Sequence, residues 1–484
     1  MSRAKVKSYF IQTLATLIIS NLCTLTGYIF AWPSYNVANF RSNSTVLSHP
    51  MTTLEISLVG SVVNIGALVA TPFCTYFLNK LGRKYTCMLF GVPYAMSWAI
   101  LSVSNYVPFV IVALALSGIG AAGVPASTIY ISEISDDSIR GILTSNAISG
   151  YFLGLFLSYS WGGYLSYYNV VHLHLGLCVL YIIMVGSLKD SPVFLMQTNK
   201  EKEAAKSIAF YRCVDVTSKE VEIELANIRL QLDPRRENIL EGKNDMTVTK
   251  ELLKIKSEPA EAKSEWKFLI NSPSSIRALT IAIITMTYTV LMGVVVLQVY
   301  AEPLFREAVP SMEPNQLTIY LAIDFIVGSL ICGVLIDRLG RKYLLIITTV
   351  LTSICILLMA TQLQFSWAPQ WTTAGFMYAF SFFYNLGPAT IPFVIAAEFF
   401  VPEVRGLCNC LINACTWLMN FVTLQLFSQL VDWVGLAPLF YLFSFFGFLG
   451  AVFCQFYLPE TKGMPIEAIP LLFIKKDKRR HYNI

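Results

Sequence analysis

The chain has 484 residues, of which 55% are hydrophobic and 13% are charged, and its formal net charge is +5. Soluble domains carry about 25% charged residues, so this composition excludes an ordinary soluble protein. The apolar residues gather in runs of about 20, the length of a helix that crosses a bilayer core. Backbone groups in lipid must find partners within their own segment, so the sequence predicts an all-α membrane protein. The apolar runs therefore predict contact with a lipid bilayer. The positive charges lie between these runs and are not spread over one face, so we expect no nucleic acid partner.

Twelve membrane spans are predicted in chain order. They cover residues 9–31, 54–78, 85–104, 107–130, 141–161, 171–188, 275–299, 317–336, 343–362, 371–396, 406–430 and 436–457. Basic residues are retained on the cytoplasmic side of a membrane, and they decide the orientation. The loops on one side of the predicted topology hold only Arg41 and Arg306, whereas lysine and arginine cluster on the other side with both termini. Both termini are therefore predicted to be cytoplasmic.

One long polar stretch divides the spans six to six. The predicted units are an N-terminal six-helix bundle at 1–188, a cytoplasmic loop with short helices at 189–274, a C-terminal six-helix bundle at 275–457 and a cytoplasmic tail at 458–484. Within the loop, apolar residues from Val221 to Leu232 recur at helical spacing and predict a short amphipathic helix. We favour a helix that lies against the bundle over one that binds a partner. Asn43 begins a glycosylation sequon in the first outward loop.

Two motifs recur in the same order in both halves. Leu-Gly-Arg-Lys-Tyr follows the second span at 81–85 and the eighth span at 339–343. A glutamate then precedes Arg-Gly by seven positions after the fourth and the tenth spans. Guanidinium and carboxylate groups at helix ends can pair across helices, and pairs that break on opening would act as a gate. The candidate gating residues are Arg83, Glu133, Arg140, Asp337, Arg341, Glu398 and Arg405. The alternative is a static, solvated charge cluster.

These motifs resemble the sugar porter family of the major facilitator superfamily, especially its facilitative glucose and trehalose transporters. The resemblance rests on segments that run through the chain, at 132–134 with 140–141, 190–195, 336–342 and 459–463. It implies two pseudo-symmetric six-helix bundles and a multi-pass protein of the plasma membrane. It further implies a carrier of a sugar or related polyol that works by alternating access, and we expect a monomer. No catalytic constellation is present, and the one ligand-like spacing, His172 with His174 at an outer helix end, is read as having no role, so we expect no enzyme, cofactor or metal site.

In the resembled fold, helices 7, 10 and 11 line the substrate cavity. The candidate substrate-binding residues on these helices are Tyr288, Thr289, Gln298, Tyr300, Tyr384, Asn385, Phe393, Thr416, Trp417 and Asn420, and Asp324 of the eighth span is added as an acid inside the membrane. The family places amides on helix 7 because sugar hydroxyls need groups that both donate and accept. This chain has Thr289, Val290 and Val295 at the aligned positions, and Ile148 replaces the glutamine of helix 5. The loss of these amides puts sugar specificity in question.

Coupling to protons is the second departure from the family. Proton-coupled relatives pair an aspartate on helix 1 with an arginine on helix 4, whereas this chain has Ile29 and Leu114. Facilitated uniport is therefore the simpler interpretation. Asp324 lies in the middle of the eighth span, where a carboxylate is by default a functional candidate. It either faces the cavity, to bind a cationic or hydroxylated solute or carry a proton, or is a protonated group bonded to a neighbouring helix.

Three functions stay open at this point. The first is facilitative uniport of a sugar such as glucose or trehalose. The second is a carrier of the same fold for a non-sugar or cationic solute, and the third is a solute sensor that does not transport.

Overall fold

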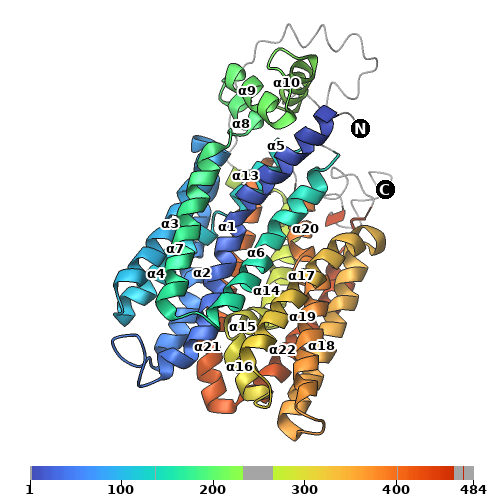
Figure 1. The fold of residues 1–484 in the computed structure, drawn as a ribbon. Helices are drawn as coiled ribbons and strands as arrows, with labels where there is room; N and C mark the ends of the chain where they lie inside the picture. The colour runs from blue at the N-terminus through green and yellow to red at the C-terminus, as the bar shows by residue number, and fades with distance from the viewer. Residues whose placement is uncertain (1–2, 137, 233–264, 401, 463–471, 474–484) are drawn as a thin grey trace.

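A computed structural model describes residues 3–136, 138–232, 265–400, 402–462 and 472–473 (Figure 1). Twelve helices in this described part are long and apolar enough to cross a membrane, which confirms the predicted number of spans. They form two bundles joined by shorter helices. The fold class predicted from the sequence is correct.

The N-terminal bundle holds the first six spans. Its helices are α1 (Arg3–Arg41), α2 (Thr53–Leu81), α3 (Arg83–Val103), α4 (Val107–Ala121), α5 (Val124–Ile134), α6 (Arg140–Gly162) and α7 (Tyr167–Ser187). A capping box starts α2, because Thr52 and Glu55 satisfy each other's backbone N–H groups. Helices α1 and α6 approach closely at two glycines: a Cβ on Gly27 would lie 2.3 Å from the Tyr151 carbonyl oxygen, and one on Gly154 would lie 2.2 Å from that of Thr24. Small residues at such crossings are typical of helix packing in membranes.

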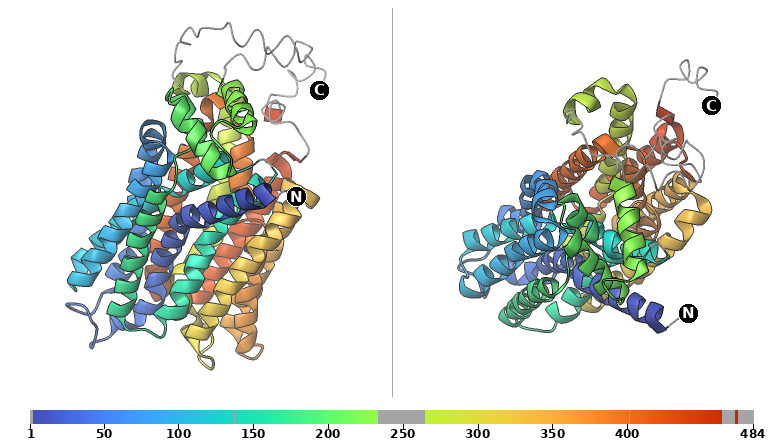
Figure 2. Two further views of the ribbon diagram at one scale, coloured as in Figure 1. Left: turned by 45° about the horizontal axis from the view of Figure 1, so that its top comes forward. Right: turned by 90° about the horizontal axis from the view of Figure 1, so that it is seen from above.

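The C-terminal bundle holds the other six spans. Its helices are α14 (Pro273–Leu291), α15 (Val294–Val299), α16 (Ala301–Ala308), α17 (Pro314–Leu339), α18 (Arg341–Phe365), α19 (Trp371–Leu386), α20 (Ile391–Glu398), α21 (Pro402–Val434) and α22 (Leu436–Tyr457). The halves meet where α2 packs against α21 and α6 packs against α17. Seen from above, N-terminal and C-terminal helices gather on different sides of the molecule (Figure 2).

Helices α8 (Pro192–Gln197), α9 (Glu201–Arg212), α10 (Lys219–Leu232) and α13 (Glu265–Asn271) connect the halves. Helix α10 is the predicted amphipathic helix. Its Val221 and Ile228 pack in one cluster with Ile208 and Ala209 of α9, and residues of α8 line the same cluster. Helices α8 to α10 and the beginning of α1 lie at one end of the molecule (Figure 1). We call this the α9 end and the opposite end the α16 end.

Three spans predicted as continuous helices are broken. The span at 275–299 divides into α14 and α15 at Gly293, which has a φ of +82° that favours glycine. The span at 371–396 divides into α19 and α20 around Pro388, whose ring nitrogen cannot donate a helical hydrogen bond. The span at 107–130 divides into α4 and α5 just before Pro125.

Candidate functional site

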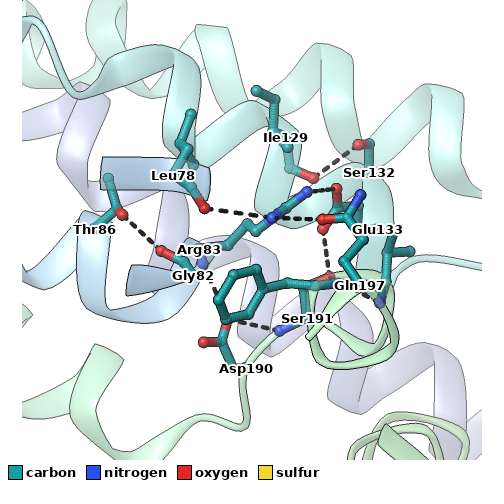
Figure 3. A network of polar contacts seen from close by, with 12 residues as sticks. Leu78, Gly82, Arg83, Thr86, Ile129, Ser132, Glu133, Asp190, Ser191 and Gln197 are labelled. Carbon is teal, nitrogen blue, oxygen red and sulfur yellow. Dashed lines mark hydrogen bonds and ion pairs between the residues drawn. The ribbon is translucent and has the colours of Figure 1, made fainter. Parts of the chain in front are cut away.

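A charge cluster at the α9 end organises the N-terminal half (Figure 3). Gly82 has a φ of +92° and turns the chain sharply between α2 and α3. The Asp190 carboxylate caps the new helix, because its Oδ1 accepts hydrogen bonds from the backbone N–H groups of Arg83 (3.1 Å) and Lys84 (3.0 Å). Burial raises the pKa of Asp190 above its ordinary value, although these N–H bonds oppose the rise.

The Arg83 side chain carries the charge of this cluster into the bundle. Its Nη2 lies 2.7 Å from Glu133 Oε1 of α5, and the two side chains are only 8% and 14% exposed. The other oxygen of Glu133 accepts a hydrogen bond from the Ser191 hydroxyl. The two repeated motifs thus meet in space, together with the start of α8 (Figure 3).

The C-terminal half repeats the arrangement. Arg341 Nη2 lies 2.9 Å from Glu398 Oε1, and Thr461 Oγ1 donates to Glu398 Oε2 at 2.6 Å. Glu460 plays the part of Asp190, because it accepts the backbone N–H of Arg341 at 3.0 Å and that of Lys342 at 3.1 Å. The capping carboxylates Asp190 and Glu460 were missed as site residues. Each of them follows the last span of its half, the sixth or the twelfth, and this matching position is the sequence feature that could have identified them.

The remaining candidate gating residues are near the two clusters in sequence. The Arg405 guanidinium donates to the Phe400 carbonyl at 3.2 Å, and Arg140 is half-buried at the start of α6. The side chain of Asp337 lies outside the described residues. The Arg83–Glu133 and Arg341–Glu398 pairs each lie within one half of the molecule.

Hydrogen bonds between the two halves lie toward the α16 end. Gln298 of α15 is bound twice by α6: its Oε1 accepts from Tyr151 Oη at 2.8 Å, and its carbonyl accepts from Tyr159 Oη. Further bonds join Tyr300 Oη to the Ile56 carbonyl (3.4 Å), the Glu302 N–H to Ser34 Oγ (2.9 Å), Ser61 Oγ to Gln425 Oε1 (2.7 Å) and Asn315 Nδ2 to the Gly163 carbonyl (3.3 Å). The α16 end is therefore closed in this conformation.

A buried carboxylate sits at this closed end. The Glu302 side chain is 4% exposed, and its Oε1 pairs with Arg306 one helical turn later. Its Oε2 is buried without a hydrogen-bond partner among the described residues. Burial raises the pKa of Glu302, against the lowering by Arg306.

Most of the predicted substrate-binding groups of α14 and α19 bond to their own half. Tyr384 Oη donates to the Thr289 carbonyl at 3.0 Å, and Tyr288 Oη lies 3.3 Å from Cys454 Sγ. Asn385 Nδ2 donates to the Ser381 carbonyl at 2.8 Å. The Ser381 hydroxyl in turn donates to Asp324 Oδ2, so Asp324 bonds to the neighbouring helix α19.

The other predicted site residues differ in their surroundings. Thr416 Oγ1 donates to the Ile412 carbonyl of its own helix at 2.9 Å. Trp417 and Asn420 are half-buried on α21, and Phe393 is 47% exposed on α20. The side chain of Ile148 lies outside the described residues. Asn43 is exposed in the connection between α1 and α2, at the α16 end.

The proteins that the chain resembles are named as sugar transporters. The chain is 24% identical over 475 residues to the facilitated trehalose transporter Tret1 of Culex quinquefasciatus, and covers 86% of it. It is 25% identical over 471 residues to Tret1 of Drosophila virilis, and covers 48% of that longer protein. The chain shares its fold with the xylose transporter XylE from E. coli in an inward-open conformation. The TM-score is 0.73 at 19% sequence identity, and the match covers 94% of this chain and 98% of XylE.

The family model described as "Sugar (and other) transporter" matches residues 8–473, nearly the whole chain. The match agrees with the resemblance inferred from the repeated motifs. The chain therefore belongs to the family of sugar (and other) transporters and is a membrane transporter, not an enzyme.

Proposed function

We propose that the chain is a facilitative uniporter that carries a sugar such as glucose or trehalose by alternating access. The observation that carries the proposal is the row of hydrogen bonds that joins the two bundles at the α16 end, centred on Gln298 and Tyr300. A carrier needs such ties at one end at a time, because they must break when that end opens. The names of the curated relatives support a sugar as the solute.

The two charge clusters at the α9 end supply the complementary gate in this proposal. Each holds its arginine within its own half here, at Glu133 and at Glu398. When the α9 end closes, the candidate gating residues of the two halves approach each other, and Arg140, Asp337 and Arg405 complete the contact. In this proposal the chain is divided at residues 188, 274 and 457, and the two six-helix bundles are the units that move. The protein acts as a monomer.

The orientation and location are part of the same proposal. The chain lies in the plasma membrane with the α9 end in the cytoplasm, and the distribution of basic residues assigns both termini to the same side. Asn43 is then outside the cell, where it is glycosylated; its exposure at the α16 end supports this.

Uptake of radiolabelled glucose and trehalose in a transport-deficient host tests the function. We expect saturable uptake of at least one of them, down its gradient and without dependence on a proton gradient. Solute-dependent thermal stabilisation without flux would instead indicate a sensor. Uptake of organic cations but of neither sugar would indicate a carrier with a different substrate.

Asp324 gives a separate prediction about coupling. Because its carboxylate is the acceptor for the Ser381 hydroxyl, an asparagine at this position offers the same oxygen to the same donor. Asp324→Asn should therefore retain uptake within about twofold, because the bond is kept, with an unchanged pH profile. Uptake measured between pH 5.5 and 8 (roughly the range in which perturbed groups titrate) checks this. A flattened profile would mean that Asp324 carries a proton.

A further inference from the structure

Three amides and an indole form one unpaired face of α21. Asn409, Asn413, Trp417 and Asn420 follow each other at intervals of four, four and three positions, so they share a side of the helix. All four are half-buried. Within the described part of the chain, none of their side chains makes a hydrogen bond. Their polar atoms keep some exposed surface, so they are not buried without a partner. We call these four residues the α21 amide face.

The amide face does not point into lipid. The lipid-exposed side of the same helix is apolar: Leu418 is 45% exposed, Val422 is 36% exposed and Leu426 is 45% exposed. With about 100° per residue, Leu418 and Val422 point away from Asn413 and Asn420. Each unpaired amide turned toward hydrocarbon would cost roughly 1–3 kcal/mol. The amides therefore lie on the side of the helix that faces away from lipid.

The exposure of the amide face changes along the helix. Toward the α16 end, Leu424 continues the direction of Asn413 and is 0% exposed, and Ser428 is 6% exposed. Toward the α9 end, Asn413 and Asn409 keep part of their surface exposed, and Gly406 is exposed. The same side of α21 is thus buried near the hydrogen bonds that join the halves and partly exposed toward the α9 end, so the amide face can be reached from the α9 end.

We propose that Asn413 and Asn409 form a binding subsite for a polyhydroxylated solute, on the α9 side of Trp417 and Asn420. A carboxamide presents one acceptor and two donor hydrogens, which match a hydroxyl group that both donates and accepts. The subsite supplies amides that α14 and α15 lack at Thr289 and Val295. This inference rests on the proposed function, because it assigns the solute a second set of contacts within the same transport path.

Transport kinetics test the role of the amide. We expect Asn413→Leu to raise the KM for the transported sugar about 5- to 10-fold, the effect of one lost hydrogen bond, with kcat within twofold. Asn413→Gln should restore most of the affinity because it keeps the carboxamide. Leu418→Ala, a change on the lipid side of the same turn, is the matched control and should leave KM unchanged. An unchanged KM in Asn413→Leu, with glucose and trehalose as the probes, overturns the subsite.

Thiol labelling tests the path without reference to a substrate. The partly exposed cysteines Cys213, Cys410 and Cys415 are first replaced by serine. In nanodiscs, a charged methanethiosulfonate should modify Asn413→Cys at least tenfold faster than Leu418→Cys, because only a hydrated side chain ionises readily. Equal rates overturn the inference even if the wild-type chain imports sugar. Fast labelling without uptake of either sugar overturns the proposed function and the solute assigned here, so the two failures are distinguishable.

Discussion

Glu133→Ala should destabilise the chain more than the equivalent change Glu398→Ala in the other half. Glu133 binds Arg83 and Ser191, and removing it leaves a buried guanidinium without its carboxylate. Breaking a buried pair in this way costs about 3–5 kcal/mol. The C-terminal pair is less buried, with side chains 18% and 19% exposed against 8% and 14%, so water replaces more of the lost contact there. Thermal unfolding of the purified protein, followed by size-exclusion chromatography, gives the ranking.

Two further variants separate charge from packing. Glu133→Gln keeps an acceptor for the Ser191 hydroxyl while it removes the ion pair, so its Tm should fall between those of the wild type and Glu133→Ala. Glu222→Ala on α10 removes an exposed carboxylate and should leave the Tm unchanged. If Glu398→Ala lowered the Tm as much as Glu133→Ala, burial would not be what distinguishes the two clusters.

The arrangement of spans could be predicted from the sequence because the lipid bilayer imposes it. A run of apolar residues long enough to cross the core must be helical wherever it lies in the fold, so the number and order of spans follow from local composition. The breaks could not be read in the same way. Gly293 and Pro388 lie within hydrophobic runs that satisfy the length criterion, and only the backbone angle at Gly293 shows that α14 ends there.

The candidate site was predictable in its residue types but not in its pairings. The repeated motifs placed Arg83 and Glu133 at the same end of the molecule, yet motif spacing says nothing about Ser191, which completes the cluster from a third segment. Gln298 is the sharper case. The resemblance implied a substrate-binding role for it, and that role stays a prediction, whereas its present hydrogen bonds reach across to α6. Contacts between halves depend on which end is closed, and a single sequence does not encode one state.

The ties at Gln298 lead to the second large expected effect. Tyr151 and Tyr159 of α6 each donate one hydrogen bond to Gln298 in the closed conformation, and these bonds must break when the α16 end opens. A neutral hydrogen bond contributes about 1 kcal/mol. The double change Tyr151→Phe with Tyr159→Phe should therefore shift the equilibrium toward the open α16 end by about 2 kcal/mol, or roughly 30-fold.

Labelling of Val299→Cys measures that shift. Val299 is 0% exposed on α15 and faces Gly60 of the other half, where a Cβ would lie 3.1 Å from the valine side chain. A membrane-impermeant thiol reagent can reach this position only when the α16 end is open, so the labelling rate should rise with the open fraction. Tyr35→Phe is the matched control, because Tyr35 Oη bonds Ser158 Oγ at 3.0 Å within the N-terminal half. A similar acceleration by Tyr35→Phe would mean that the phenol groups support the fold of the bundle rather than hold the two halves together.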